Sequence, residues 1–201
     1  MCTLEKRGNI FFLTLTGAGK KDQEHRLNPT LIAAIRAALS EVRSQSVPGS
    51  ALITQAEGRF FSNGVDLRPG AAAAEEELIA MVDLFRGVVA DLLSLPMPTV
   101  AAVAGHAAAA GLILAISHDY VVMARSRAVL YLSELDIGMS LPDYFTALIQ
   151  GKLSSSAARR ELALRAAKIG GDAAYDSAEE VAAAAVERVE HGICMYNCTI
   201  P

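Results

Sequence analysis

The sequence predicts an α/β fold in which strands and helices alternate along a single domain. Three observations support this class. Apolar residues recur at helical spacing in several long segments, short β-rich runs lie between those segments, and no repeat of fixed period is present. With 201 residues, of which 52% are hydrophobic, the chain can bury one sizeable core.

The expected strands are short apolar runs bounded by turn residues. Gly8-Asn9 separates the first two runs, which is typical of a β-hairpin. Gly105-His106 is predicted to be a turn that leads from a strand into a helix. The strands are expected at residues 3–7, 10–16, 50–55, 59–67, 99–104, 120–124 and 129–132.

The expected helices begin at recognisable capping residues. Asn28 is a suitable N-cap for the first long helix, and Pro29 suits its first position. Ser177 and Glu180 have the spacing of a capping box at the start of the last helix. The helices are expected at residues 29–44, 75–93, 109–117, 143–153, 155–167 and 177–190.

Composition argues against several classes of function. The chain has 18 Lys and Arg against 22 Asp and Glu, and only 5% aromatic residues with no Trp, so nucleic-acid binding is not expected. Three cysteines cannot form a disulfide framework and indicate a reducing compartment, and the N-terminus has no secretory signal. The stretch 92–118 has no charged residue and is long enough to span a bilayer. Pro96, Pro98 and Gly105 interrupt it, which favours two buried elements with a turn between them. No membrane span is therefore expected.

Histidines and cysteines provide no convincing metal site. His191, Cys194 and Cys198 offer three ligands with no fourth nearby, so no metal is expected. His118 and Asp119 are sequence neighbours whose side chains face different ways, and His118 is therefore interpreted as a structural histidine.

Two loops and one carboxylate are the candidates for chemistry. Gly64 allows unusual backbone dihedrals after an apolar strand, and the small residues 105–111 lead into a helix N-terminus. Backbone N–H groups from two such loops can form an oxyanion hole, although close helix–sheet packing explains the same pattern. Glu134 follows the apolar strand expected at 129–132. Burial at that position would raise the pKa of its carboxyl, as a general acid/base requires. The alternative is a glutamate exposed to solvent at the end of the strand.

Six sequence blocks, taken in order, carry a family resemblance. They are Met1-Cys2-Thr3-Leu4-Glu5-Lys6-Arg7-Gly8, His25-Arg26-Leu27, Phe61-Ser62-Asn63-Gly64, Gly105-His106-Ala107-Ala108-Ala109-Ala110-Gly111-Leu112, Ser117-His118-Asp119-Tyr120 and Ser133-Glu134-Leu135-Asp136-Ile137-Gly138. These blocks resemble the crotonase (enoyl-CoA hydratase/isomerase) superfamily, and most closely the plant-type peroxisomal Δ3,Δ2-enoyl-CoA isomerases. The resemblance implies a crotonase-like spiral of β-β-α units, a homotrimer and an acyl-CoA thioester substrate.

Carried over to this chain, the resemblance assigns roles to individual residues. It places the oxyanion-hole donors at the N–H groups of Val65 and Ala110 and the catalytic carboxylate at Glu134. Hydratases of the superfamily use two glutamates, and the position of the first is occupied by Ile113 in this chain. The implied reaction is therefore isomerisation of 3-enoyl-CoA to trans-2-enoyl-CoA in fatty acid β-oxidation. The resemblance implies no separate cofactor. The residues implied to contact the substrate are Arg26, Leu27, Asn63, Gly64, Asp66 and Leu67, with Lys20 and Lys21 near the phosphates of CoA.

The resemblance decays after Ile169. We therefore expect a core at residues 1–169 and a divergent, shortened C-terminal helix and tail at 170–201, with the C-terminal helical part incomplete. A catalytically impaired isoform that binds acyl-CoA or pairs with other subunits stays open as an alternative, as does another crotonase reaction such as hydration. The resemblance implies the peroxisome, but Thr199-Ile200-Pro201 is no targeting tripeptide, so a cytoplasmic location also stays open.

Overall fold

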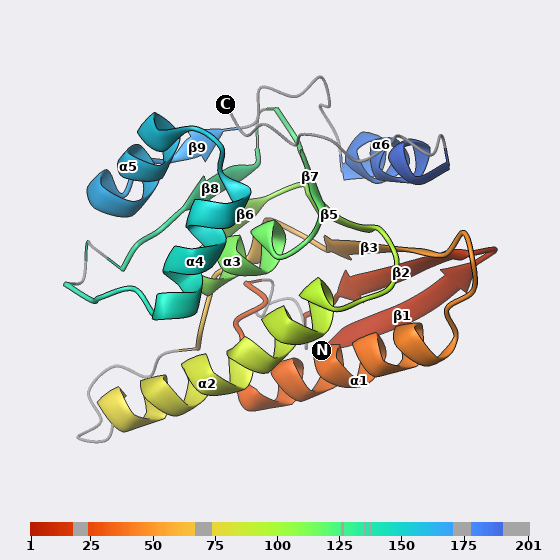
Figure 1. Ribbon diagram of the computed structural model, residues 1–201, viewed down its shortest axis with the longest axis horizontal. Coiled ribbons are helices and arrows are strands. Elements are labelled where there is room, and N and C mark those ends of the chain that lie inside the picture. The colour runs from red at the N-terminus through yellow and green to blue at the C-terminus, as the bar shows by residue number, and fades with distance from the viewer. Residues whose placement is uncertain are drawn as a thin grey trace.

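In the part of the chain that it describes, the computed structural model contains two β-sheets wrapped by helices (Figure 1). It describes residues 1–17, 24–66, 74–125, 127–134, 136, 138–170 and 178–190. The α/β class predicted from the alternating pattern is confirmed.

The first sheet has five strands in the order β1-β2-β3-β5-β7. The N-terminal pair β1–β2 is antiparallel and pairs Arg7 with Ile10, which confirms the predicted hairpin. The other neighbouring pairs are parallel. The strands are β1 (Cys2–Arg7), β2 (Ile10–Leu15), β3 (Ala51–Ala56), β5 (Thr99–Val103) and β7 (Tyr120–Met123).

The second sheet has the order β4-β6-β8-β9. Its strands are β4 (Phe60–Ser62), β6 (His106–Ala108), β8 (Val129–Tyr131) and β9 (Ile169–Gly170), of which only β9 runs antiparallel to its neighbour. Three times in succession the chain adds one strand to the first sheet, crosses to the second sheet for the next strand, and then forms a helix. This repeated β-β-α unit is the spiral that the resemblance implied.

The predicted turn at Gly105-His106 is wrong, because His106 begins strand β6. The His106 N–H donates to Arg59 O at 3.0 Å, and His106 pairs with Phe60 of β4. The chain thus passes directly from β5 in one sheet to β6 in the other. The strand expected at 59–67 is also shorter than predicted, because β4 spans only Phe60–Ser62.

Within the described parts of the chain, six helices pack around the sheets. The predicted cap at Asn28 is confirmed, because its Oδ1 accepts from the Leu31 N–H at 2.9 Å and Pro29 is the first helical residue. The helices are α1 (Pro29–Ser44), α2 (Ala74–Leu93), α3 (Ala110–Ile116), α4 (Asp143–Lys152), α5 (Ser156–Arg165) and α6 (Ala178–Glu190). None of the described helices is long and apolar enough to cross a membrane.

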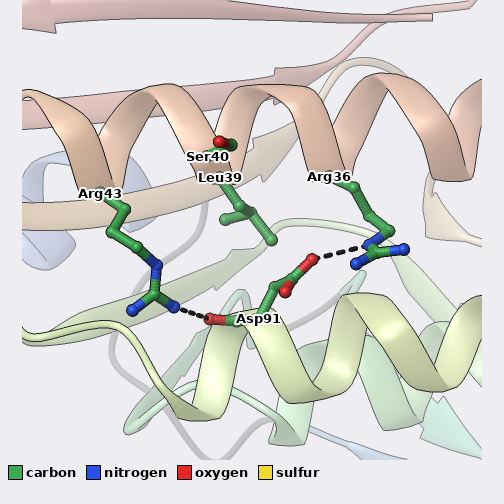
Figure 2. A pocket seen from close by; sticks show the side chains of 5 residues that line it. All are labelled: Arg36, Leu39, Ser40, Arg43 and Asp91. Carbon is green, nitrogen blue, oxygen red and sulfur yellow. Dashed lines mark hydrogen bonds and ion pairs between the residues drawn. The ribbon is translucent and has the colours of Figure 1, made fainter.

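Helices α1 and α2 lie side by side on one face of the first sheet, and α6 lies on the other (Figure 1). Arg36 and Arg43 of α1 reach toward Asp91 of α2 (Figure 2), with 2.7 Å between Arg36 Nε and Asp91 Oδ2. Only the Arg36–Asp91 contact is an ion pair, because Arg43 donates to the backbone oxygen of Asp91. A partly exposed ion pair contributes little to stability, so the buried apolar faces of the helices provide most of it.

Helix α6 belongs to the same core as the first sheet. It contacts β3, β5 and β7, and its side chains Val181, Ala184 and Ala185 are 0 to 4% exposed. The division of the chain at residues 169 and 170 stays a prediction, but the described part of the C-terminal region packs on the domain that the earlier residues form.

Gly111 of α3 supports a close contact between two elements, and its replacement should destabilise the protein. A Cβ atom there would overlap the backbone oxygen of Ser62 at the end of β4. We expect Gly111→Ala to lower the free energy of unfolding by about 3 kcal/mol, at the upper end of the usual overpacking penalty. Urea denaturation followed by circular dichroism measures this change.

Gly151→Ala is the matched control, because Gly151 also lies in a helix and a Cβ there would meet nothing within 4 Å. We expect this control to leave stability unchanged or to raise it slightly, since alanine is the better helix former. Equal stability of the two variants would contradict the close packing of α3 on β4.

Candidate active site

Three parallel strands of the second sheet deliver the candidate residues to one end of that sheet. Strand β4 leads to Gly64 and Val65, β6 leads to Ala110, and β8 leads to Glu134. Because parallel strands end at the same edge, their carboxyl ends form a natural site for a ligand. The topology thus gathers three groups that are far apart in the sequence.

Gly64 is in close contact with the loop that precedes α3. Its φ is +77°, and a Cβ atom there would lie 2.9 Å from Ala109 Cβ, 3.0 Å from Ala108 O and 3.4 Å from Ala110 N. The first two separations are too short for an unstrained contact, so only glycine fits without displacing the loop. This contact places the backbone that carries the Val65 N–H beside the Ala110 N–H.

The orientation of the Val65 N–H follows from a hydrogen bond on the opposite side of its peptide group. The Leu27 N–H donates to Gly64 O at 2.8 Å, and the Asp66 N–H donates to Leu27 O at 3.1 Å. In a planar trans peptide the C=O and the following N–H point in opposite directions. Because Gly64 O points toward Leu27, the Val65 N–H points away from it, and no described residue accepts a hydrogen bond from it.

The Ala110 N–H is the first N–H of helix α3. Ala109 precedes it with φ of +52° and ψ of −125°, a strained conformation for a residue with a Cβ. The Ala109 carbonyl accepts from Leu112 and Ile113 inside the helix, so the Ala110 N–H points out of the helix N-terminus. It has no acceptor among the described residues, which leaves two free backbone donors from neighbouring loops.

The loop before α3 is also tied to the strand that leads to the carboxylate. The Ala109 N–H donates to Tyr131 O at 2.9 Å, and Tyr131 ends β8 three residues before Glu134. The backbone oxygen of Glu134 accepts from the Met139 N–H at 2.8 Å. The positions of Ala110 and Glu134 are therefore coupled through main-chain hydrogen bonds.

Glu134 is buried, which settles the alternative of an exposed strand-end glutamate. It is 7% exposed, and its Oε2 has no hydrogen-bond partner among the described residues. Burial raises the pKa of this carboxyl, and backbone hydrogen bonds at Ser133 and Glu134 oppose the shift only in part. A carboxyl with a raised pKa and an oxygen that has no hydrogen-bond partner is suited to accept and release a proton as a general acid/base.

The residues expected to contact a substrate fall in two neighbouring segments. Arg26 and Leu27 lie in one, and Asn63, Gly64 and Asp66 lie in the other, joined by the pairing of Leu27 with Val65. The Arg26 guanidinium and the Asn63 amide both contact the carboxylate of Glu24. Leu67, Lys20 and Lys21 lie outside the described residues.

His118 is a structural histidine, as predicted. Its Nδ1 donates to Leu114 O at 2.9 Å, and its Nε2 accepts from the Thr54 hydroxyl at 2.8 Å. Full burial lowers its pKa to about 4, so the ring is neutral at physiological pH. The candidate metal ligands His191, Cys194 and Cys198 lie outside the described residues, among which no group of three potential ligands occurs.

Two surface hollows lie away from these loops. The smaller, about 200 Å³, is the hollow between α1 and α2 beside Arg36, Arg43 and Asp91 (Figure 2). The larger, about 1040 Å³, lies between the first sheet and the start of β6, and residues such as Arg7, Gln55 and His106 line it. Neither is lined by Val65, Ala110 or Glu134.

Two features of the site had no signal in the sequence. Nothing distinguishes Glu24, which holds Arg26 and Asn63, from other polar loop residues. The left-handed φ of Ala109 is equally hidden, because alanine favours helices and rarely adopts positive φ. Both depend on contacts with residues that are distant in the sequence.

Comparisons with known proteins agree with this geometry. The family model "Enoyl-CoA hydratase/isomerase" matches residues 13–190. Enoyl-CoA delta isomerase 2, peroxisomal, from Arabidopsis thaliana is 56% identical over 201 residues, covering 92% of this chain and 82% of that protein. Enoyl-CoA delta isomerase 3 from the same plant is 51% identical, with the same coverage of both chains.

Solved structures show the same fold. The Mtb enoyl-CoA isomerase aligns with a TM-score of 0.83 and 25% identity, covering 96% of this chain and 85% of that chain. An enoyl-CoA hydratase from Mycobacterium marinum aligns with a TM-score of 0.82 and 27% identity, covering 96% and 86%. The site geometry, the family match and these relatives lead to one conclusion: the chain belongs to the enoyl-CoA hydratase/isomerase family.

Proposed function

We propose that the protein isomerises 3-enoyl-CoA thioesters to trans-2-enoyl-CoA. Among the described residues Glu134 is the only buried carboxylate, and it follows β8 at the end of the sheet where the N–H groups of Val65 and Ala110 lie without a described acceptor; this observation carries the proposal. Two curated relatives at 56% and 51% identity are named enoyl-CoA delta isomerases, which supports the assignment.

The reaction needs one proton carrier and one site for negative charge. The thioester oxygen accepts hydrogen bonds from the Val65 and Ala110 N–H groups. The Glu134 carboxylate removes a proton from C2, and the electron pair of that C–H bond moves into the thioester to form a dienolate. The same carboxyl then returns the proton to C4 as the C2=C3 double bond forms. No atom is gained or lost, and no electron acceptor is required.

The two N–H groups stabilise the charge that develops on the thioester oxygen. A donor of this kind contributes about 2.7–4 kcal/mol to transition-state stabilisation. Both groups are held in place before substrate binds, so little reorganisation is needed during the reaction. The raised pKa of Glu134 brings its basicity closer to that of the carbon acid it deprotonates.

A single carboxylate favours isomerisation over hydration. Hydration requires one group to activate water and another to deliver a proton, whereas a 1,3-proton shift needs one group that moves between two carbons. Ile113, at the position of the first hydratase glutamate, is fully buried in α3 and cannot transfer protons. Because the fold matches both isomerases and hydratases, this residue difference carries the distinction.

The CoA part of the substrate is proposed to follow the paired segments beside the oxyanion hole. Arg26, Leu27, Asn63, Gly64, Asp66 and Leu67 are its proposed contacts, and Lys20 and Lys21 are placed near its phosphates by the family resemblance. The proposal needs no separate cofactor. A homotrimer is proposed from the family resemblance alone. The peroxisome is proposed from the same resemblance and from the names of two Arabidopsis relatives, enoyl-CoA delta isomerases 1 and 2, which both include the word peroxisomal.

Replacement of the proposed proton carrier tests the reaction. Glu134→Gln keeps the side-chain shape but cannot act as a base, so we expect kcat for a 3-enoyl-CoA to fall by about 10²–10⁴-fold. Formation of the conjugated 2-enoyl-CoA, followed by ultraviolet absorbance, measures this rate. Glu161→Gln on exposed helix α5 is the control and should retain wild-type turnover. A folded wild-type chain without turnover would instead support a non-catalytic acyl-CoA-binding isoform.

The pH profile tests the ionisation of the same group. Glu134 must be deprotonated to remove the C2 proton, and its pKa is raised by burial. We therefore expect kcat/KM to decline as the pH falls through this raised pKa, at a higher pH than an ordinary glutamate with pKa about 4.3 would produce. The remaining slow activity of Glu134→Gln should lack this decline. A wild-type profile that stays flat down to the ordinary glutamate range would contradict the assignment.

A further inference from the structure

A short segment beside the oxyanion hole is joined to the Gly64 loop by a dense set of hydrogen bonds. We call residues 24–27 the strap. Its backbone accepts from the Asn63 N–H at 2.8 Å and from the Ser62 hydroxyl at 2.8 Å. Two bonds of Leu27 complete the pairing: its N–H donates to Gly64 O, and its carbonyl accepts from the Asp66 N–H. The peptide that carries the Val65 N–H thus lies inside a hydrogen-bonded ladder.

Glu24 contacts this ladder through its side chain as well as its backbone. Its Oε2 accepts from Asn63 Nδ2 at 3.0 Å and from Arg26 Nε at 2.7 Å. Glu24 and Asn63 are therefore joined by two bonds, one between main chains and one between side chains. The hydrogen bond from Asn63 is the main reason why the pKa of Glu24 lies below its usual range, so the carboxylate is ionised at neutral pH.

The residue that follows Glu24 and the residue that follows Asn63 both have left-handed backbone conformations. His25 has φ of +46°, which is uncommon for a residue other than glycine, and Gly64 has φ of +77°. Such conformations persist where surrounding contacts hold them. His25 is held by its own bonds, since its carbonyl accepts from Ser62 and its Nε2 lies 2.7 Å from Glu57 O. Glu24 and Asn63 provide the corresponding contact at the edge of the Gly64 turn.

We propose that Glu24 is a positioning residue for the reaction, and that it acts through Asn63 to hold the Val65 N–H in the direction of the thioester oxygen. Without the side-chain bond, the Asn63–Gly64 backbone can rotate more freely, and the peptide between Gly64 and Val65 rotates with it. The kinetic form of this inference rests on the proposed isomerase function. Asn63 thereby has a role in orienting the loop, in addition to its proposed contact with substrate.

Kinetics of four variants test the proposal. We expect Glu24→Ala and Asn63→Ala each to lower kcat by about tenfold, less than full loss of one oxyanion donor, which costs about 10²–10³-fold. The double variant should be no slower than either single variant, because both remove the same contact. Glu24→Gln retains an oxygen that can accept from Asn63, and it should stay within about threefold of wild type.

Glu5→Ala is the matched control, because Glu5 also pairs with an arginine two residues later but lies on β1, away from the site. It should leave kcat unchanged. Losses of kcat that multiply in the double variant, or wild-type kcat in both alanine variants, would overturn the proposal. Equal kcat losses in Glu5→Ala and Glu24→Ala would also overturn it.

Hydrogen exchange separates this inference from the proposed reaction, since it requires no turnover. Exchange of the Leu27 N–H, which is bonded to Gly64 O, reports whether the strap and the loop stay paired. We expect exchange at least about tenfold faster in Glu24→Ala and Asn63→Ala than in wild type, with no change in Glu5→Ala. Unchanged exchange would overturn the positioning role even if the wild-type enzyme is active. Faster exchange in a chain that lacks isomerase activity would instead refute only the reaction.

Discussion

The close approach of Gly64 to the Ala108–Ala110 backbone is the contact on which the site depends. A Cβ at Gly64 would lie 2.9 Å from Ala109 Cβ and 3.0 Å from Ala108 O, so any other residue would displace the loop. Because the two loops touch at this point, two N–H groups from separate strands become neighbours without any side chain between them. A site built from backbone donors is rigid, and it can stabilise charge on an oxygen that is absent from the resting protein.

The repeated β-β-α unit explains how these groups come together. Each unit sends its second strand into the second sheet in parallel, so the three strand ends that carry Val65, Ala110 and Glu134 meet at one edge. Main-chain hydrogen bonds then fix the relative positions, from Leu27 to Gly64 on one side and from Ala109 to Tyr131 on the other. The reactive carboxyl is the only one of the three groups that titrates, and burial sets its pKa.

Much of this architecture could be predicted from local sequence patterns. The cap at Asn28, the hairpin at Gly8-Asn9 and the position of Glu134 after an apolar strand all depend on neighbours within a few residues. The strap could not be predicted, because its bonds join residues 37 to 39 positions apart and no periodic pattern reports them. Strand β6 at His106 has no local signal for a similar reason, because its pairing partner, Phe60, lies far away in the chain.

The proposed mechanism depends on hydrogen bonds from the Val65 and Ala110 N–H groups to the thioester oxygen. The most direct test is nuclear magnetic resonance of the ¹⁵N-labelled protein with a saturated acyl-CoA and with the thioether analogue that lacks the carbonyl oxygen. A new hydrogen bond moves an amide proton downfield, so the Val65 and Ala110 amide protons should shift downfield with the thioester relative to the thioether. Identical positions of both amide protons in the two saturated complexes would contradict the claim, because the carbonyl would then contact neither group.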